Sequence, residues 1–130
     1  MATELPLFEW SFNATATMAT SQFRAVKQDT ANPGNTVIAA AVTDRCIGII
    51  QNNPAAGRTG NVLTMGVSKF IASGVIHVGD ALGVTATGAF AAITPGVNTT
   101  IYLVGQSLSE CADGDTGTGI FNFPSAGRAA

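Results

Sequence analysis

Three side chains around residue 77 are of the types that nucleophilic catalysis uses. Ser73, His77 and Asp80 supply a hydroxyl, an imidazole and a carboxylate within one short segment. A hydrolytic triad also needs a serine held on a sharp turn and amide groups that stabilise an oxyanion. The residues around Ser73 predict neither feature. We therefore expect His77 to be an ordinary residue of a strand that spans Val75 to Val78.

Acidic residues offer a second kind of chemistry. Asp113-Gly114-Asp115 has the start of a calcium loop, but Gly117 stands where a further ligand belongs and no bidentate Glu follows. A small β-barrel hydrolase that uses Asp80, Asp113 or Asp115 is the enzymatic alternative. His77 is the only histidine, so one chain cannot build a histidine-based metal cluster. The sequence predicts no enzyme activity, no metal and no cofactor.

The two cysteines, Cys46 and Cys111, are not spaced as a C-x-x-C metal or redox pair. The N-terminus lacks a basic segment followed by an apolar one, so we expect no secretion signal and reduced thiols. We expect both thiols to be inert and buried or half-buried. The sequence is compatible with two separate thiols and with a bridge between them.

The aromatic residues near the N-terminus form the strongest candidate for a binding site. Phe8, Trp10 and Phe12 alternate with polar residues, and the alternation continues to Met18, as in a half-buried strand or an extended arm. Three rings so close together need a surface to pack on. Either the rings belong to the core of their own domain, or they dock onto a partner or a sister subunit.

Charged residues are sparse. They make up 11% of the 130 residues, against roughly 25% in an average soluble protein, and none occurs from Ala81 to Ser109. Few ions must be desolvated when another protein binds such a surface. The net charge is −2 and the six basic residues are scattered, which argues against nucleic acid. No apolar run is long enough to predict a membrane span.

Turn residues recur about every eight to twelve positions, which is typical of an all-β barrel or sandwich. We predict one β domain over residues 20–123, preceded by an N-terminal strand or arm over 1–19 and followed by a frayed tail over 124–130. We expect no long amphipathic helix. The predicted strands within the domain cover 23–27, 36–42, 46–50, 62–70, 75–78, 81–84, 89–93, 100–108 and 119–123.

An internal echo links the middle of the chain to its end. Each copy predicts a strand, a glycine-rich turn and a second strand. Cys111 occupies the place of Pro54 in this comparison, which favours a structural role for the cysteine. The identical positions lie 57 residues apart (105 − 48 = 57) and are Gly48 and Gly105, Ala55 and Ala112, Gly57 and Gly114, Thr59 and Thr116, and Gly60 and Gly117.

Several longer blocks follow one another in a characteristic order, and they are Phe23–Lys27, Ile47–Gly57, Val62–Lys69, Gly79–Leu82 and Val104–Gly114. In this order they resemble the small capsid decoration, or cement, proteins of tailed bacteriophages. The resemblance covers residues 20–123. It implies a small β-rich fold of the β-clip or barrel kind, attachment to the outside of a shell of major capsid protein, and no enzymatic activity.

The resulting hypothesis is a virion structural protein. Made in the host cytoplasm, it would bind the outer surface of a phage capsid and stabilise the shell against the pressure of packaged DNA. We expect a homotrimer, because linked weak contacts act together and closed symmetry is usual, with Phe8, Trp10 and Phe12 at the interface. The alternative is a head-fibre or carbohydrate-binding β module on the virion surface, whose exposed rings stack on sugars.

Overall fold

The computed structural model describes residues 5–130, and every regular element within them is a β-strand. The expected all-β fold class is therefore confirmed. Among these residues there is no helix long and apolar enough to cross a membrane. The strands are β1 (Leu5–Ala14), β2 (Ala25–Gln28), β3 (Asn35–Ile38), β4 (Gly48–Ile50), β5 (Thr59–Ile71), β6 (Ala81–Val84), β7 (Phe90–Ile93), β8 (Tyr102–Leu103), β9 (Gly105–Ser107), β10 (Thr116–Asn122) and β11 (Gly127–Arg128).

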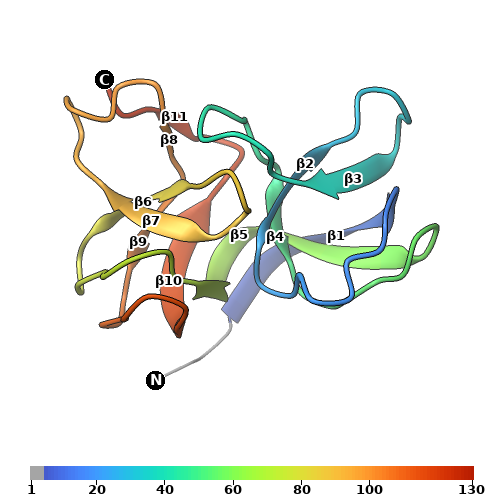
Figure 1. The fold of residues 1–130 in the computed structure, drawn as a ribbon, viewed down its shortest axis with the longest axis horizontal. Helices are drawn as coiled ribbons and strands as arrows, with labels where there is room; N and C mark the ends of the chain where they lie inside the picture. Colours follow the sequence, from blue (N-terminus) through green and yellow to red (C-terminus); the bar gives the residue numbers. More distant parts are fainter. Residues whose placement is uncertain (1–4) are drawn as a thin grey trace.

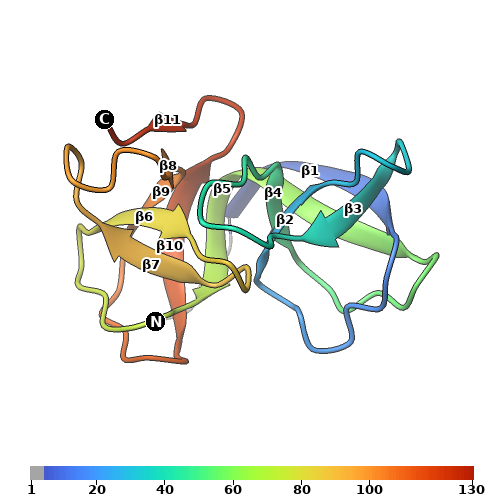
Figure 2. The same cartoon turned by 45° about the horizontal axis from the view of Figure 1, so that its top comes forward.

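Nine of the strands belong to one sheet that curls into two barrels. β1, β3, β2, β4 and β5 follow one another, and β1 also pairs with β5, so these five strands close the first barrel. The sheet then continues from β5 through β10, β9, β6 and β7, and a bridge between Ala72 and Phe90 brings β7 back to the end of β5. The second barrel thus shares the 13-residue β5 with the first. Figures 1 and 2 show the two barrels as neighbouring lobes with β5 between them.

The two barrels repeat the same strand pairing in the same register. The equivalence extends well beyond the stretch of similar sequence, because it includes the parallel contact that closes each barrel. The chain is therefore a tandem repeat of one five-stranded barrel. Equivalent pairs, first barrel before second, are Ile49–Leu63 and Gln106–Ile120, Val26–Ile38 and Leu82–Ala92, Phe12–Gly60 and Phe70–Gly117, and the parallel pairs Ala14–Thr36 and Ala72–Phe90.

The echo found in the sequence is the hairpin that completes each barrel, as predicted. Gly57 and Gly114 sit at matching places in its turn, with φ of 75° and 83°. Glycine adopts this left-handed conformation without steric cost, which explains its presence in both copies. The matching turn hydrogen bonds run from Arg58 N–H to Ala55 O (3.0 Å) and from Asp115 N–H to Ala112 O (3.1 Å).

The shared strand changes barrel at Gly66. Its φ is 130°, which side-chain-bearing residues rarely adopt, and glycine inside a strand often marks a tight bend at a barrel corner. Gly66 lies opposite Pro6 of β1 on one side and Phe121 of β10 on the other. The β1–β5 register shifts directly beside it, between Pro6 and Phe8. This bend lets one strand serve both barrels.

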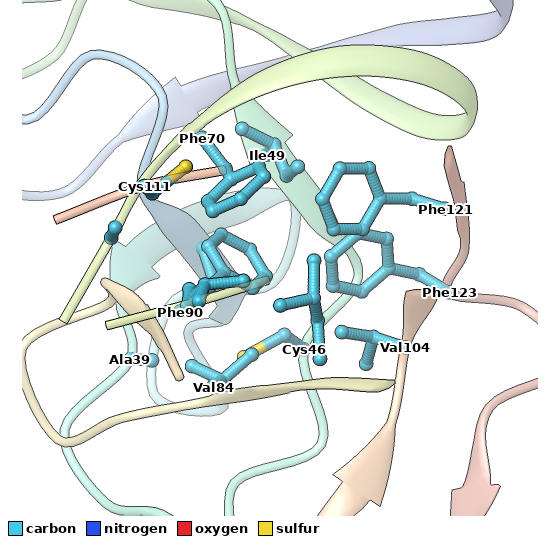
Figure 3. Packing of buried hydrophobic residues seen from close by; sticks show 14 residues of the cluster. Ala39, Cys46, Ile49, Phe70, Val84, Phe90, Val104, Cys111, Phe121 and Phe123 are labelled. Carbon is cyan, nitrogen blue, oxygen red and sulfur yellow. The ribbon is translucent and has the colours of Figure 1, made fainter. Parts of the chain in front are cut away.

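Two hydrophobic clusters fill the molecule. The smaller one lies inside the first barrel around Val26, Ile50 and Val62. The larger one fills the second barrel with four phenylalanine rings (Figure 3), and their centroids lie between 5.2 and 6.3 Å apart in mostly edge-on or tilted pairs. Ala25 and Ile49 of the first barrel belong to this larger cluster, so the barrels share a core.

The N-terminal and C-terminal segments are both paired. β1 pairs with β5 from Leu5 to Asn13, so the N-terminal segment is an integral strand of the first barrel and not a separate arm. Residues 124–130 were expected to fray, but β11 pairs with β8, and Ala129 is buried with its N–H bound to Ile101 O at 2.9 Å. The glycine and alanine of this tail carry no alternating pattern, so its sequence does not predict pairing.

Three predicted strands differ most clearly from the structure, because one is shortened, one is a loop and one is divided. The run 36–42 ends as a strand at Ile38, because the Asp44 carboxylate accepts the N–H groups of Ala40 and Ala41 at 2.8 and 3.0 Å and turns the chain. The predicted strand 75–78 is a loop in which Ile76 alone forms a bridge, to Cys111. The single strand expected over 100–108 is divided into β8 and β9.

Candidate functional site

The aromatic residues singled out in the sequence line an open groove on the first barrel. We call it the aromatic groove, and its volume is about 1110 Å³. Its apolar wall comes from β1, β5 and the segment after β10, and its charged rim comes from β2 and the loop before β4. The lining residues used below are Phe8, Trp10, Phe12, Lys27, Asp29, Asp44, Arg45, Cys46, Met65, Phe123 and Pro124.

The three rings divide between the core and the surface. Phe12 is half-buried and packs against the cluster inside the first barrel. Phe8 and Trp10 remain 62% and 67% exposed. Of the two alternatives raised by the sequence, Phe12 therefore packs on the core of its own domain, whereas the rings of Phe8 and Trp10 are accessible to a partner.

The register of β1 against β5 places Trp10 and Phe12 on the same face of the strand. Trp10 lies opposite Val62 and Phe12 opposite Gly60, and Val62 belongs to the interior cluster. The strict alternation that the sequence shows is then interrupted by a register shift between Phe8 and Glu9. Such irregularities re-aim side chains. The shift can therefore re-aim Phe8, whereas Trp10 and Phe12 lie on one face and differ in how deeply each ring is buried.

An ion pair with shared hydrogen bonds forms part of the groove's rim. Lys27 Nζ lies 2.9 Å from Asp44 Oδ2, and both side chains are largely shielded from solvent. Burial alone raises the pKa of Asp44, but the N–H groups of Ala40 and Ala41 and the Lys27 ammonium outweigh it, so the pKa lies below its usual value. Asp44 is therefore a carboxylate at neutral pH.

Two other polar groups complete the rim. Thr15 Oγ1 donates to Asp29 Oδ2 at 2.6 Å and Asn32 also donates to that carboxylate, and these bonds lower the pKa of Asp29. The Arg45 guanidinium lies over the ring of Tyr102, 5.9 Å from its centroid. The groove thus combines an apolar wall with positive and negative groups at its edge, a composition that suits a protein segment or the faces of sugar rings.

The candidate triad is not assembled. His77 Nδ1 contacts Glu110 Oε2 at 2.9 Å, and both side chains are about two-thirds exposed. The Asp80 carboxylate accepts the backbone N–H of His77 at 2.8 Å and so closes a turn instead of orienting the imidazole. Glu110 lies far from His77 in the sequence, and no motif signals their contact. The structure therefore gives His77 a carboxylate neighbour at the surface and not a catalytic partner.

The acidic residues considered for hydrolysis or calcium binding each hold a turn. Asp113 Oδ1 accepts the N–H of Gly74 at 2.7 Å, and Asp115 Oδ2 accepts the N–H of Ala112 at 2.8 Å. These two carboxylates therefore serve different backbone segments. Among residues 5–130, no group of three or more His, Cys, Asp or Glu side chains is placed to hold a metal ion.

The two cysteines are buried and unpaired. Burial raises the pKa of the Cys46 thiol to about 12, and the nearby Asp44 charge acts in the same direction, so this thiol stays protonated and unreactive. A Cβ placed on Gly117 would lie 2.4 Å from Cys111 Sγ, just as one on Gly60 would approach Pro54 Cγ at 3.3 Å. Cys111 therefore fills the same packing position as Pro54.

Sequence reasoning missed the far wall of the aromatic groove. Met65 comes from the shared strand, and Phe123 and Pro124 come from the end of the chain. Their proximity to Trp10 depends on β1, β5 and β10 lying side by side, which the sequence does not reveal. The alternation around Phe8 was the one usable signal.

No protein-family model and no curated protein sequence matches the chain. Among solved structures, the chain is similar to the N base of the head fiber gp8.5 of bacteriophage phi29, with a TM-score of 0.65 and 17% sequence identity. The match covers 89% of this chain and 94% of the other.

The chain shares the fold of a phage head-fiber base. Because the match spans nearly all of both chains, the likeness includes both barrels and the strand between them.

Proposed function

We propose that this chain is a structural protein of a bacteriophage virion that attaches to the outer surface of the head. The likeness to the phi29 head-fiber base carries the proposal, because it pairs the two-barrel fold with a protein of a phage head. The resemblance of residues 20–123 to capsid decoration proteins points to the same part of the virion. The chain would assemble in the host cytoplasm and remain with the particle.

The aromatic groove is the proposed contact with the major capsid protein. Phe8 and Trp10 present two large rings to solvent, and exposed tryptophan is enriched among the residues that dominate binding energy. Phe12, half-buried beneath them, supports the wall. The charges of Lys27, Asp44 and Arg45 at the rim would set the orientation of the bound partner.

The proposed action is mechanical and requires no catalysis and no cofactor. A protein that bridges neighbouring capsid subunits adds its own binding free energy to the cost of separating them. Stable contacts of this kind bury on the order of 1,000 Å² or more of the two partners' surfaces taken together, and the chain's surface of 6229 Å² leaves room for more than one such contact. A homotrimer would multiply such contacts through their effective concentration.

Binding to purified capsids that lack the protein tests this proposal. The protein is expected to co-sediment with them and to raise their tolerance of heat or osmotic shock. A variant with Phe8→Ala and Trp10→Ala should lose at least about 30-fold in affinity. A control with Val75→Ala and Val97→Ala removes two equally exposed apolar side chains elsewhere and should bind normally. Absence of binding by the unaltered chain at physiological salt would contradict the proposal.

A second candidate is the base of a head fibre or a carbohydrate-binding module, and the phi29 likeness favours the first of these. In that case the bound chain would carry a further protein outward and leave the shell no stronger. Electron microscopy of decorated capsids separates the two functions through projecting fibres, and osmotic tolerance provides the matching readout. Binding to glycans by the isolated chain, abolished by Trp10→Ala, would instead support sugar recognition.

A further inference from the structure

The two barrels have the same strands but different surroundings. On the outer face of the first barrel, four side chains from β2, β4, β5 and the residues before β4 are fully or almost fully buried. They are Ala25 (0% exposed), Cys46 (4%), Ile49 (0%) and Leu63 (0%). Outward-facing residues of a barrel reach such values when something covers them.

For three of these residues the cover is the second barrel. Ala25, Cys46 and Ile49 belong to the same hydrophobic cluster as Phe90 and Phe121, and Figure 3 shows Ile49 close to the phenylalanine rings. The turn between β6 and β7 also binds the first barrel directly. Its hydrogen bonds run from Ala25 N–H to Gly88 O (2.8 Å) and from Arg24 Nη1 to Thr87 O (3.0 Å).

Among the side chains that the structure describes, none covers the equivalent face of the second barrel in this way. The repeat assigns Ala81, Leu103, Gln106 and Ile120 to the places of Ala25, Cys46, Ile49 and Leu63. Leu103 and Ile120 are 37% and 47% exposed, Gln106 is exposed, and Ala81 is partly so. These four residues line a shallow hollow of about 640 Å³, and none of the residues lining it is ionisable.

Where structural repeats stack, a face that no neighbour covers is normally polar, which keeps it soluble. The second barrel ends instead in an uncharged hollow with Ile120 and Leu103 at its surface. Its counterpart in the first barrel is covered by a barrel of the same fold. Two copies brought together at this hollow would meet without repulsion between like charges. The hollow also adjoins the aromatic groove, because Met65 lines both.

We infer that this face of the second barrel, centred on Ile120 and Leu103, is the contact surface for a second copy of the chain. The contact extends between molecules the barrel-on-barrel packing that already exists within one. It does not depend on attachment to a capsid, because the purified chain alone carries this face.

Sedimentation equilibrium of the purified full chain over a range of concentrations tests the inference. The unaltered chain is expected to self-associate. Ile120→Lys and, separately, Leu103→Lys should each raise the dissociation constant about 30-fold or more, because a buried lysine at the contact must lose its water. Val97→Lys, which alters an equally exposed apolar residue of a turn outside the hollow, should leave association unchanged.

The thermal unfolding midpoint of each variant, measured under monomeric conditions, shows that the fold is intact. A chain that stays monomeric at every accessible concentration overturns the inference. So does an assembly that withstands both lysine variants but dissociates with Trp10→Ala, because that assembly would be held by the aromatic groove. Neither result depends on capsid binding, so failure here is distinguishable from failure of the proposed function.

Discussion

At the scale of single residues, the repeat is maintained by glycines that allow strands to approach closely. Gly48 and Gly105 occupy equivalent places, and a Cβ on either would lie 2.3 Å from the carbonyl oxygen of Leu63 or Ile120 respectively. Neither glycine is needed for a left-handed backbone, since neither has a positive φ. Their requirement is spatial, and it explains why both copies of the echo keep glycine there.

Gly105→Ala is therefore expected to destabilise the protein by roughly 1–3 kcal/mol, the usual cost of forcing extra atoms into a packed position. Urea unfolding followed by circular dichroism measures the change. Gly127→Ala is the matched control, because a Cβ there has nothing within 4 Å. Equal stability of the Gly105 variant and the control would show that the strands separate without penalty.

Asp44→Asn is expected to cost about 1–2 kcal/mol at pH 7, because hydrogen bonds to a charged acceptor and the Lys27 contact are weakened. The folded-state pKa of Asp44 lies below the unfolded value of about 3.9. Its contribution to stability is therefore present above that unfolded pKa and is lost as pH falls through the folded one. Urea unfolding at pH 7 and near pH 3 should show the gap between the two proteins narrowing in acid. A gap that is constant with pH would mean that the charge of Asp44 contributes nothing.

What the sequence reveals at this scale is residue type and spacing. It identified Phe8, Trp10 and Phe12, and it correctly identified the turn role of the region around Asp113 and Asp115. It did not separate the half-buried Phe12 from the exposed Trp10, because a strand's alternation says which side a ring lies on but not where the interior ends.

At the scale of strands and hairpins, local patterns predicted most elements and missed their limits. The hairpin of β4 and β5 and that of β9 and β10 follow from the glycine turn and its flanking apolar residues. The full length of β5 could not be predicted in this way. Its two halves belong to different barrels, and no local sequence pattern indicates the bend at Gly66. The segment 75–78 was predicted as a strand because Val75 and Val78 are apolar and β-branched. In the structure it is a loop, and both side chains are exposed.

The turn between β6 and β7 connects the second barrel to the first, and Phe90 beside it lies among three other rings. Phe90→Ala is expected to cost about 3–5 kcal/mol through the cavity it leaves. Because Ala25 and Ile49 share that cluster, hydrogen exchange should rise in the first barrel's β2 and β4 as well as in β6 and β7. Faster exchange confined to the second barrel would show that the two cores are energetically independent. Val97→Ala serves as the control and should change exchange in neither barrel.

At the scale of the whole molecule, the sequence indicated an all-β chain and one repeated hairpin, but not the repetition of an entire barrel. The remaining equivalences are structural: Thr36 and Phe90, for example, share a place and little chemistry. Packing differs between the copies because one barrel is covered and the other is not. The equivalence of the two barrels is therefore visible in their pairing registers even where the side chains differ.

The fragment 1–71 contains every strand of the first barrel, yet we expect it not to fold cooperatively. Without the second barrel, Ala25 and Ile49 lose their cover and the bent half of β5 loses its partner strand β10. Thermal unfolding followed by circular dichroism should show no sharp transition for the fragment, and addition of the fragment 72–130 should restore one. A sharp transition of 1–71 alone would show that the first barrel is an independent domain.

The kink at Gly66 has a further consequence for how this protein can be oriented. A flexible linker would let one barrel change its orientation while the other stayed bound to a partner. Here β5 passes from the first barrel into the second while it remains hydrogen-bonded, first to β1 and then to β10. A partner that binds the first barrel therefore also fixes the direction in which the second barrel points.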